Sequence, residues 1–219
     1  ESRNLLKDWW QGLSDRTLII FLIANVFFTI YAAQLSSTLP LYLANFVPGG
    51  NTQTGFSEQW ISYFFVWHAL LKILFQLPLT RKLKSLSYVG SLAMALFLWS
   101  GGFLLIWLIG VTSTKPLIFA IGAFSVIAMA EIIYSPAASA LVGEIAPVDL
   151  RGIYFSLESE CWAIGFLIGP ALGGWALDHP NTAGTNFWLM LIITAGVAAV
   201  ILRFLKHRMT DVVSNPVGN

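Results

Sequence analysis

The sequence predicts an all-α membrane protein that crosses the bilayer six times. It has 219 residues, of which 57% are hydrophobic and only 11% are charged, whereas soluble domains carry about 25% charged residues. A soluble core of this length could not cover so much apolar surface. The net charge of +1 gives no reason to expect a nucleic-acid partner, and the single cysteine excludes an internal disulfide and a cysteine-rich metal site. We expect no cofactor and no bound metal.

Six segments are apolar over the roughly 20 residues that a spanning helix needs. They are residues 17–43, 60–79, 88–111, 116–142, 152–177 and 187–205. We therefore predict a six-helix domain at residues 17–208 and a cytoplasmic tail at residues 209–219. Residues 1–16 place apolar side chains at helical spacing (Leu5, Leu6, Trp9, Trp10 and Leu13), which predicts an amphipathic helix on the cytoplasmic membrane surface. A plain charged linker is the alternative.

Lysine and arginine are distributed unevenly between the two ends of these segments. Ten lie at one side (Arg3, Lys7, Arg16, Arg81, Lys82, Lys84, Arg151, Arg203, Lys206 and Arg208), only Lys115 lies at the other, and Lys72 falls inside the second segment. Basic residues gather on the cytoplasmic side of membrane proteins. We therefore predict a multi-pass protein of the inner or plasma membrane with both termini in the cytoplasm.

Three of the segments carry polar side chains that recur on one helical face. The sets are His68, Lys72 and Gln76 in the second segment, Glu131, Tyr134, Ser135 and Ser139 in the fourth, and Tyr31, Gln34 and Thr38 in the first. The simplest common cause is a shared aqueous cavity in which a solute binds. Hydrogen bonding between helices is the alternative for each set, because membrane helices also use such residues to associate.

The fifth segment adds two carboxylates, Glu158 and Glu160. A charged side chain at the centre of a membrane helix costs roughly 2.5–3.5 kcal/mol, so it usually faces a bundle interior or a water-filled cavity. At about 1.5 Å of rise per residue, Lys72 lies at a depth similar to that of Glu158 and Glu160. This match predicts an ion pair between Lys72 and one of them, with Glu131 deeper.

The same segment is rich in glycine in its second half. Gly165, Gly169 and Gly173 recur every four residues, and Pro170 interrupts the helical hydrogen bonding. Small residues on one face let a neighbouring helix approach closely. We predict a close helix crossing here, either moving or static.

Residues 135–178 resemble the tenth and eleventh helices of major facilitator superfamily transporters. They contain a proline in the tenth helix (Pro136), an Ala-Pro…Arg-Gly loop at 146–152 and a Gly-x-x-x-Gly-Pro-x-x-Gly-Gly helix at 165–174. Residues 77–97 resemble the connection between the eighth and ninth helices, and residues 38–46 the outer end of the seventh. The resemblance is greatest to the branch of proton-coupled drug antiporters. The Gly-Asp-Arg signature that belongs to the N-terminal half of the family is absent.

The resemblance implies the C-terminal half of a twelve-helix fold, built from two inverted three-helix repeats. It places the first and fourth segments beside a central cavity, the second and fifth against an N-terminal six-helix half, and the third and sixth outermost. It also implies that the complete protein moves a small amphipathic solute out of the cell by alternating access, coupled to protons.

This reading assigns roles to the charged residues. Glu131 is the first candidate for carrying the coupling proton, and Glu158 or Glu160 with Lys72 is the second; a permanent ion pair and a neutral packing role for Glu131 are the alternatives. The basic residues Arg151, Arg81 and Lys82 would form a cytoplasmic gate with the other half, unless they serve only to orient the chain.

Other classes of membrane protein fit the sequence less well. An intramembrane serine protease needs a nucleophile beside a histidine, and His68 has no evident nucleophile partner. Channel filters and mitochondrial carriers have sequence repeats that are absent here. We therefore expect no enzyme, and a non-transporting membrane subunit or receptor with the same fold remains the alternative to a transporter.

Overall fold

The computed structural model describes residues 5–48, 50–112 and 114–214, and every regular element in those ranges is a helix. Six of the helices are long and apolar enough to cross a membrane. They are α2 (Arg16–Ser36), α4 (Glu58–Lys82), α5 (Tyr88–Val111), α6 (Pro116–Ile145), α7 (Arg151–Asp178) and α8 (Phe187–Ser214). The shorter elements are the helices α1 (Leu5–Ser14) and α3 (Thr38–Asn45) and the single 3-10 turns η1 (Leu83–Ser85), η2 (Val148–Leu150) and η3 (Gly184–Asn186). The predicted all-α fold with six spans is confirmed.

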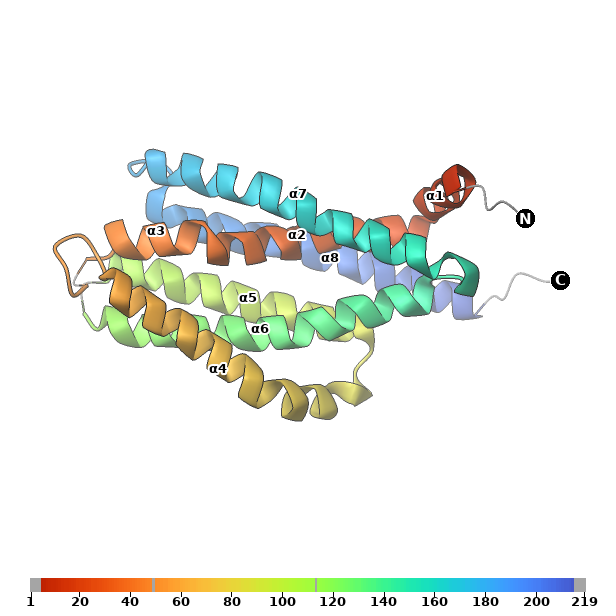
Figure 1. The fold of residues 1–219 in the computed structure, drawn as a ribbon, viewed down its shortest axis with the longest axis horizontal. Helices are drawn as coiled ribbons and strands as arrows, with labels where there is room; N and C mark the ends of the chain where they lie inside the picture. The colour runs from red at the N-terminus through yellow and green to blue at the C-terminus, as the bar shows by residue number, and fades with distance from the viewer. Residues whose placement is uncertain (1–4, 49, 113, 215–219) are drawn as a thin grey trace.

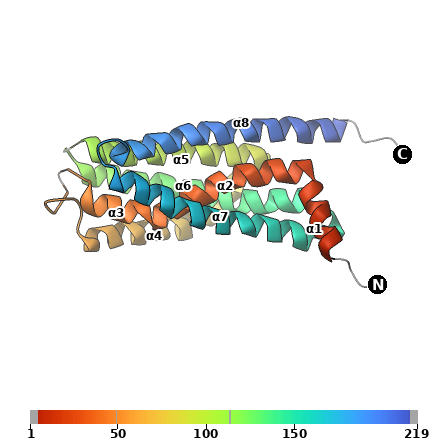
Figure 2. The same ribbon diagram turned by 90° about the horizontal axis from the view of Figure 1, so that it is seen from above.

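The helices pack in three layers, as a comparison of Figures 1 and 2 shows. Helices α2 and α6 form the middle layer, α5 and α8 cover one side of it, and α3, α4 and α7 lie on the other side, with α4 and α7 at opposite edges. Helix α4 packs mainly on α6, whereas α7 packs mainly on α2. The middle layer is the most enclosed: 56% of the apolar window of α2 and 50% of that of α6 is buried, against 22% in α4.

The two ends of the bundle carry different connections. Helix α1, the C-terminal end of α8 and the connections that contain η1 and η2 lie together at one end, and the connections after α3, α5 and α7 lie at the other (Figure 1). The basic residues Arg81 and Lys82 end α4 and Arg151 begins α7, so they lie at the first end. That this end faces the cytoplasm stays a prediction, and Arg3 and residues 215–219 lie outside the described residues.

The first span is broken where the sequence predicted one continuous helix over residues 17–43. Helix α2 ends at Ser36, Ser37 caps both helices, and α3 resumes at Thr38. Two causes act together. The hydroxyls of Ser36 and Ser37 bond back to the carbonyl of Ala33, at 3.2 and 2.6 Å, which competes with the helical pattern. Pro40 has no N–H with which to bond the carbonyl of Ser36.

The last span is longer than predicted. Helix α8 continues past residue 205 to Ser214, so part of the predicted tail is helical. At the other terminus, residues 5–14 form a separate helix, α1, which precedes α2. Its Trp9 packs against the core while Leu6 and Trp10 remain exposed.

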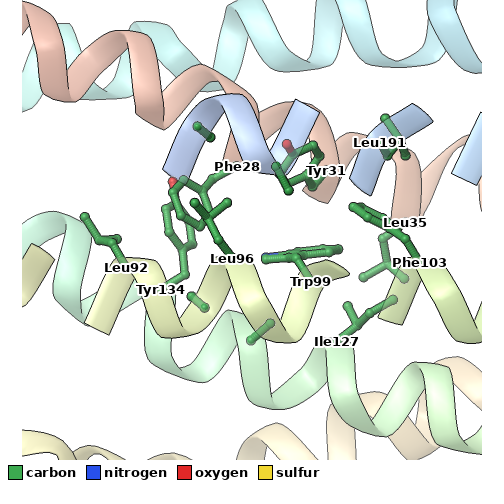
Figure 3. Close-up of a cluster of buried hydrophobic side chains, with 14 of the residues drawn as sticks. Phe28, Tyr31, Leu35, Leu92, Leu96, Trp99, Phe103, Ile127, Tyr134 and Leu191 are labelled. Atoms are coloured by element: carbon green, nitrogen blue, oxygen red, sulfur yellow. The ribbon is translucent and has the colours of Figure 1, made fainter. Parts of the chain in front are cut away.

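An aromatic core joins α2, α5 and α6 (Figure 3). The ring of Phe28 stacks on that of Tyr134, with centroids 4.5 Å apart. The ring of Tyr31 meets Phe103 edge-on at 5.2 Å, and Trp99 lies beside both. This core holds the middle layer against α5 and thereby fixes the helix faces that α2 and α6 present on the opposite side.

The glycines of α7 lie against α2 and leave no room for a side chain. A Cβ atom on Gly165 would overlap Thr29, one on Gly169 would lie 2.7 Å from the Cβ of Ala33, and one on Gly173 would overlap Thr38. Pro170 lies next to this contact, inside the helix. The backbones of α2 and α7 therefore approach closely along the predicted glycine face.

Candidate functional site

A cavity of about 550 Å³ lies between the helices of the bundle. Its walls come from α2, α4, α6 and α7, and Trp99 of α5 contributes from behind. It contains six of the residues that the sequence predicted as functional: His68, Lys72, Gln76, Glu131, Tyr134 and Ser135. The polar faces of α4 and α6 thus meet in one place, which we call the polar groove.

The centre of the polar groove is one carboxylate shared by two nitrogen groups. The Nζ atom of Lys72 lies 2.6 Å from Oε2 of Glu131, and Nε2 of His68 lies 3.4 Å from the same oxygen. The side chains of Glu131 and His68 are only 14% and 10% exposed, whereas that of Lys72 is 42% exposed. Residues 68 and 72 are one helical turn apart, so they face α6 together.

The predicted ion pair of Lys72 with Glu158 or Glu160 is wrong, because Lys72 pairs with Glu131. The depth estimate placed Glu131 roughly 5 Å deeper than Lys72, at 1.5 Å per residue, and the long lysine side chain spans this difference. Depth alone did not reveal which helices are neighbours: α4 packs on α6, while α7 packs on α2.

Neither glutamate of α7 is among the residues that line the polar groove. The side chain of Glu158 is half-buried and that of Glu160 is exposed. Within the described residues, neither one makes a hydrogen bond or an ion pair. Their place in coupling stays a prediction.

The polar set of the first span, from α2 and the start of α3, does not line the groove, contrary to the prediction for Tyr31, Gln34 and Thr38. The Tyr31 hydroxyl bonds to that of Thr194 in α8 at 3.0 Å. The Gln34 amide donates to the carbonyl of Gly169 at 2.7 Å, and Thr38 donates to Gln34. All three side chains are buried between helices, so the alternative of hydrogen bonding between helices holds for this set.

Aromatic side chains complete the walls, and the sequence analysis did not select them. Phe65 precedes His68 by three residues on the same face of α4, while Trp162 and Phe166 follow Glu158 at helical spacing on α7. The sequence shows that these aromatic residues share helix faces with polar residues. Aromatic residues are common in apolar spans, however, so this spacing alone does not predict that they line a cavity.

Pro136 removes one helical hydrogen bond beside the groove. It lies inside α6 and has no N–H, so the carbonyl of Ile132 lacks its usual helical donor. Both residues line the polar groove.

The predicted gate residues Arg81, Lys82 and Arg151 are exposed at the end of the bundle that carries α1. They form no ion pair within the part of the chain that the structure describes. The structure therefore shows where these residues lie, and their role in a cytoplasmic gate stays a prediction.

The six spans and the polar groove define a helical membrane protein with a polar cavity between its spans. No family model matches the sequence. The chain is 25% identical over 192 residues to the uncharacterized MFS-type transporter YdeE of Escherichia coli, a match that covers 84% of this chain and 44% of the relative. The similarity supports the major facilitator superfamily and a transporter role. The chain spans less than half the length of this relative.

Proposed function

We propose that this chain is the C-terminal six-helix half of a secondary transporter, which moves a small amphipathic solute by alternating access and is coupled to protons. The ion pair of Lys72 with Glu131 inside the polar groove is the observation that carries this proposal. A charged pair in a bilayer is costly and is typical of solute or ion pathways. The resemblance to drug antiporters and the similarity to an MFS-type transporter support the same function.

Exposed apolar surface next to the polar groove supports a partner half. Helices α4 and α7 both line the groove, and both expose large apolar side chains, among them Leu70 and Ile73 on α4 and Leu167 on α7. An N-terminal six-helix half facing this surface would close the cavity. The aromatic walls and the central charges then suit a solute with an apolar body and a polar group.

The coupling step would take place at Glu131. A proton added to its Oε2 removes the negative charge and frees the Nζ atom of Lys72 for another acceptor. Loss of the proton restores the ion pair. If the groove faces the two sides of the membrane in turn, this exchange links proton uptake on one side to a rearrangement of α4 against α6.

Solute flux driven by a pH gradient tests the proposal in liposomes that contain the full-length protein. Glu131→Gln keeps the shape and removes the titrating group, so we expect gradient-driven transport to be lost while downhill exchange persists. Glu58→Gln, in an exposed glutamate at the first turn of α4 to which no role is assigned, is the matched control. Full gradient-driven transport in Glu131→Gln excludes Glu131 as the coupling residue, and loss only in Glu158→Gln or Glu160→Gln moves the role to α7. The absence of any flux by the wild-type protein across a solute panel favours a receptor or subunit.

A further inference from the structure

A second cavity, which we call the lateral slot, lies away from the centre of the polar groove. It has a volume of about 230 Å³ and lies between the end of α4, η1, the start of α5 and the second half of α6. These elements meet at the end of the bundle that carries α1 (Figure 1). Of the residues that the structure describes, Pro136 alone lines both cavities.

The lateral slot is narrow and its floor is apolar. Ile133 and Ala137 of α6 line it and are buried, and Ala140 lies one turn beyond Pro136. The small side chains of α6 leave space there, and α4 runs away from α6 toward this end of the bundle (Figure 1). The slot therefore lies where α4 has separated from α6, near the end of the bundle that carries α1.

Two cations lie next to the slot in the chain. Arg81 and Lys82 directly follow Thr80, which lines the slot; they do not line it themselves, and both are exposed. Helix α5 begins at the mouth with Tyr88, and the backbone N–H groups of Tyr88 and Val89 have no acceptor within the described residues. The N-terminus of a helix attracts anions through such free N–H groups and the helix dipole.

A hydroxyl without a partner opens into the same slot. Ser91 lines it and is only 6% exposed as a residue. Its hydroxyl makes no hydrogen bond in the part of the chain that the structure describes, and its oxygen is not one of the fully enclosed polar atoms. The hydroxyl is therefore free to bond a polar atom of a ligand in the slot.

One negative charge lies nearby. Glu144 lines a shallow depression that adjoins the slot at Leu86 and Tyr88. Its carboxylate repels an anion from the α6 side of the mouth. The favourable position for a negative group is therefore the side of α4 and η1, where Arg81 and Lys82 lie.

We propose that the lateral slot binds an anionic phospholipid. One acyl chain lies along Ile133, Ala137 and Ala140, and the headgroup phosphate lies between Arg81, Lys82 and the first turn of α5. An ester oxygen of the lipid accepts the hydrogen bond of Ser91. Basic pockets between membrane helices bind anionic headgroups in this way. The inference does not depend on the transport function proposed above.

Photo-crosslinking tests this site in nanodiscs that contain the full-length protein. The probes are phosphatidylglycerol and phosphatidylcholine with the same diazirine-bearing acyl chain, and mass spectrometry locates the labelled peptides. We expect phosphatidylglycerol to label residues 80–91 and 133–140 preferentially. The double variant Arg81→Gln/Lys82→Gln should lower this labelling by roughly 30-fold, at about 1 kcal/mol for each cation, while Arg203→Gln/Lys206→Gln, on α8 at the same end, should leave it unchanged.

A second pair of variants tests the acyl chain. Ala140→Phe fills the slot and should abolish labelling of residues 133–140, whereas Val200→Phe on the exposed face of α8 should not. If Ala140→Phe does not purify as a monodisperse protein, the smaller substitution Ala140→Leu replaces it in the same experiment. Equal labelling by the two lipids, or labelling that persists in the filled slot, would overturn the proposal and indicate ordinary annular lipid.

Discussion

The Nζ atom of Lys72 lies 2.6 Å from Oε2 of Glu131, across the contact between α4 and α6. His68 directs its Nε2 at the same oxygen from 3.4 Å, one turn along α4. One carboxylate oxygen thus faces two nitrogen groups on the same helical face, and Lys72 holds the shorter contact. The pair links the least buried span, α4, to the well-buried α6, so a change at Glu131 acts on the contact between them.

Removal of Lys72 alone should destabilise the protein more than removal of both partners. Lys72→Met leaves the Glu131 carboxylate without its cation, which costs about 3–5 kcal/mol when a pair is fully buried. We expect about 1–2 kcal/mol here, because the Lys72 side chain is 42% exposed and is screened by water. Unfolding in detergent of Lys72→Met, Glu131→Met and the double variant measures the coupling. Additive effects of the two single changes would show that the pair contributes nothing.

Substitution by alanine should destabilise the protein at one of two adjacent glycines of α7 and not at the other. A Cβ atom on Gly173 overlaps Thr38 and lies close to Gln34, whereas one on Gly174 meets nothing within 4 Å. Overpacking of this kind typically costs about 1–3 kcal/mol. Gly173→Ala should therefore lower the thermal stability of the purified protein, and Gly174→Ala should not. Equal melting temperatures for both variants would mean that α2 and α7 are not in close contact there.

Cysteine labelling should separate the polar groove from the polar set of α2. In a Cys161→Ala background, Ser135→Cys lies in the groove and should react with a small hydrophilic thiol reagent, because residue 135 is exposed. Gln34→Cys should not react, since residue 34 is fully buried against Gly169. Rapid labelling at residue 34 would show that the polar residues of α2 line the cavity, as the sequence predicted.

Loss of the Gln34 amide should reduce stability without changing solute binding. Gln34→Leu removes the hydrogen bonds to Gly169 and Thr38, and bonds between membrane helices average about 0.6 kcal/mol with a maximum of about 1.7. Gln76→Leu, in the groove, should instead weaken solute binding and leave the melting temperature nearly unchanged. Solute competition and thermal unfolding of the two variants give the comparison; the reverse pattern contradicts the assignment of Gln34 as a packing residue.

Side-specific labelling tests the orientation of the chain. Thr52 lies in the connection after α3 and Ser85 in η1, at opposite ends of the bundle, and both are exposed. Thr52→Cys should react with an impermeant reagent added outside intact cells, and Ser85→Cys should react only after the membrane is opened. Reaction of both from the same side is incompatible with the predicted topology.

The sequence by itself determined the helices and the number of crossings. Length and hydropathy are local properties, and a segment in hydrocarbon must satisfy its backbone within its own helix. This is why α5 matches its predicted bounds. The break at Ser37 also follows from local chemistry, namely the serine hydroxyls and Pro40. The sequence did not predict it because the apolar residues continue without interruption on both sides of the break.

Only the tertiary structure decided which polar residues meet. The sequence gives the face and depth of Lys72, but its partner depends on which helix packs beside α4, and that helix is α6 rather than α7. The polar residues of α2 show the same limit. Their sequence pattern fits a cavity wall as well as a helix contact, and in the structure they bond to the neighbouring α7 and α8. The lateral slot exists only because α4 departs from α6 beside small side chains. Each of these features joins residues that are far apart in the chain, so the packing of whole helices determines them.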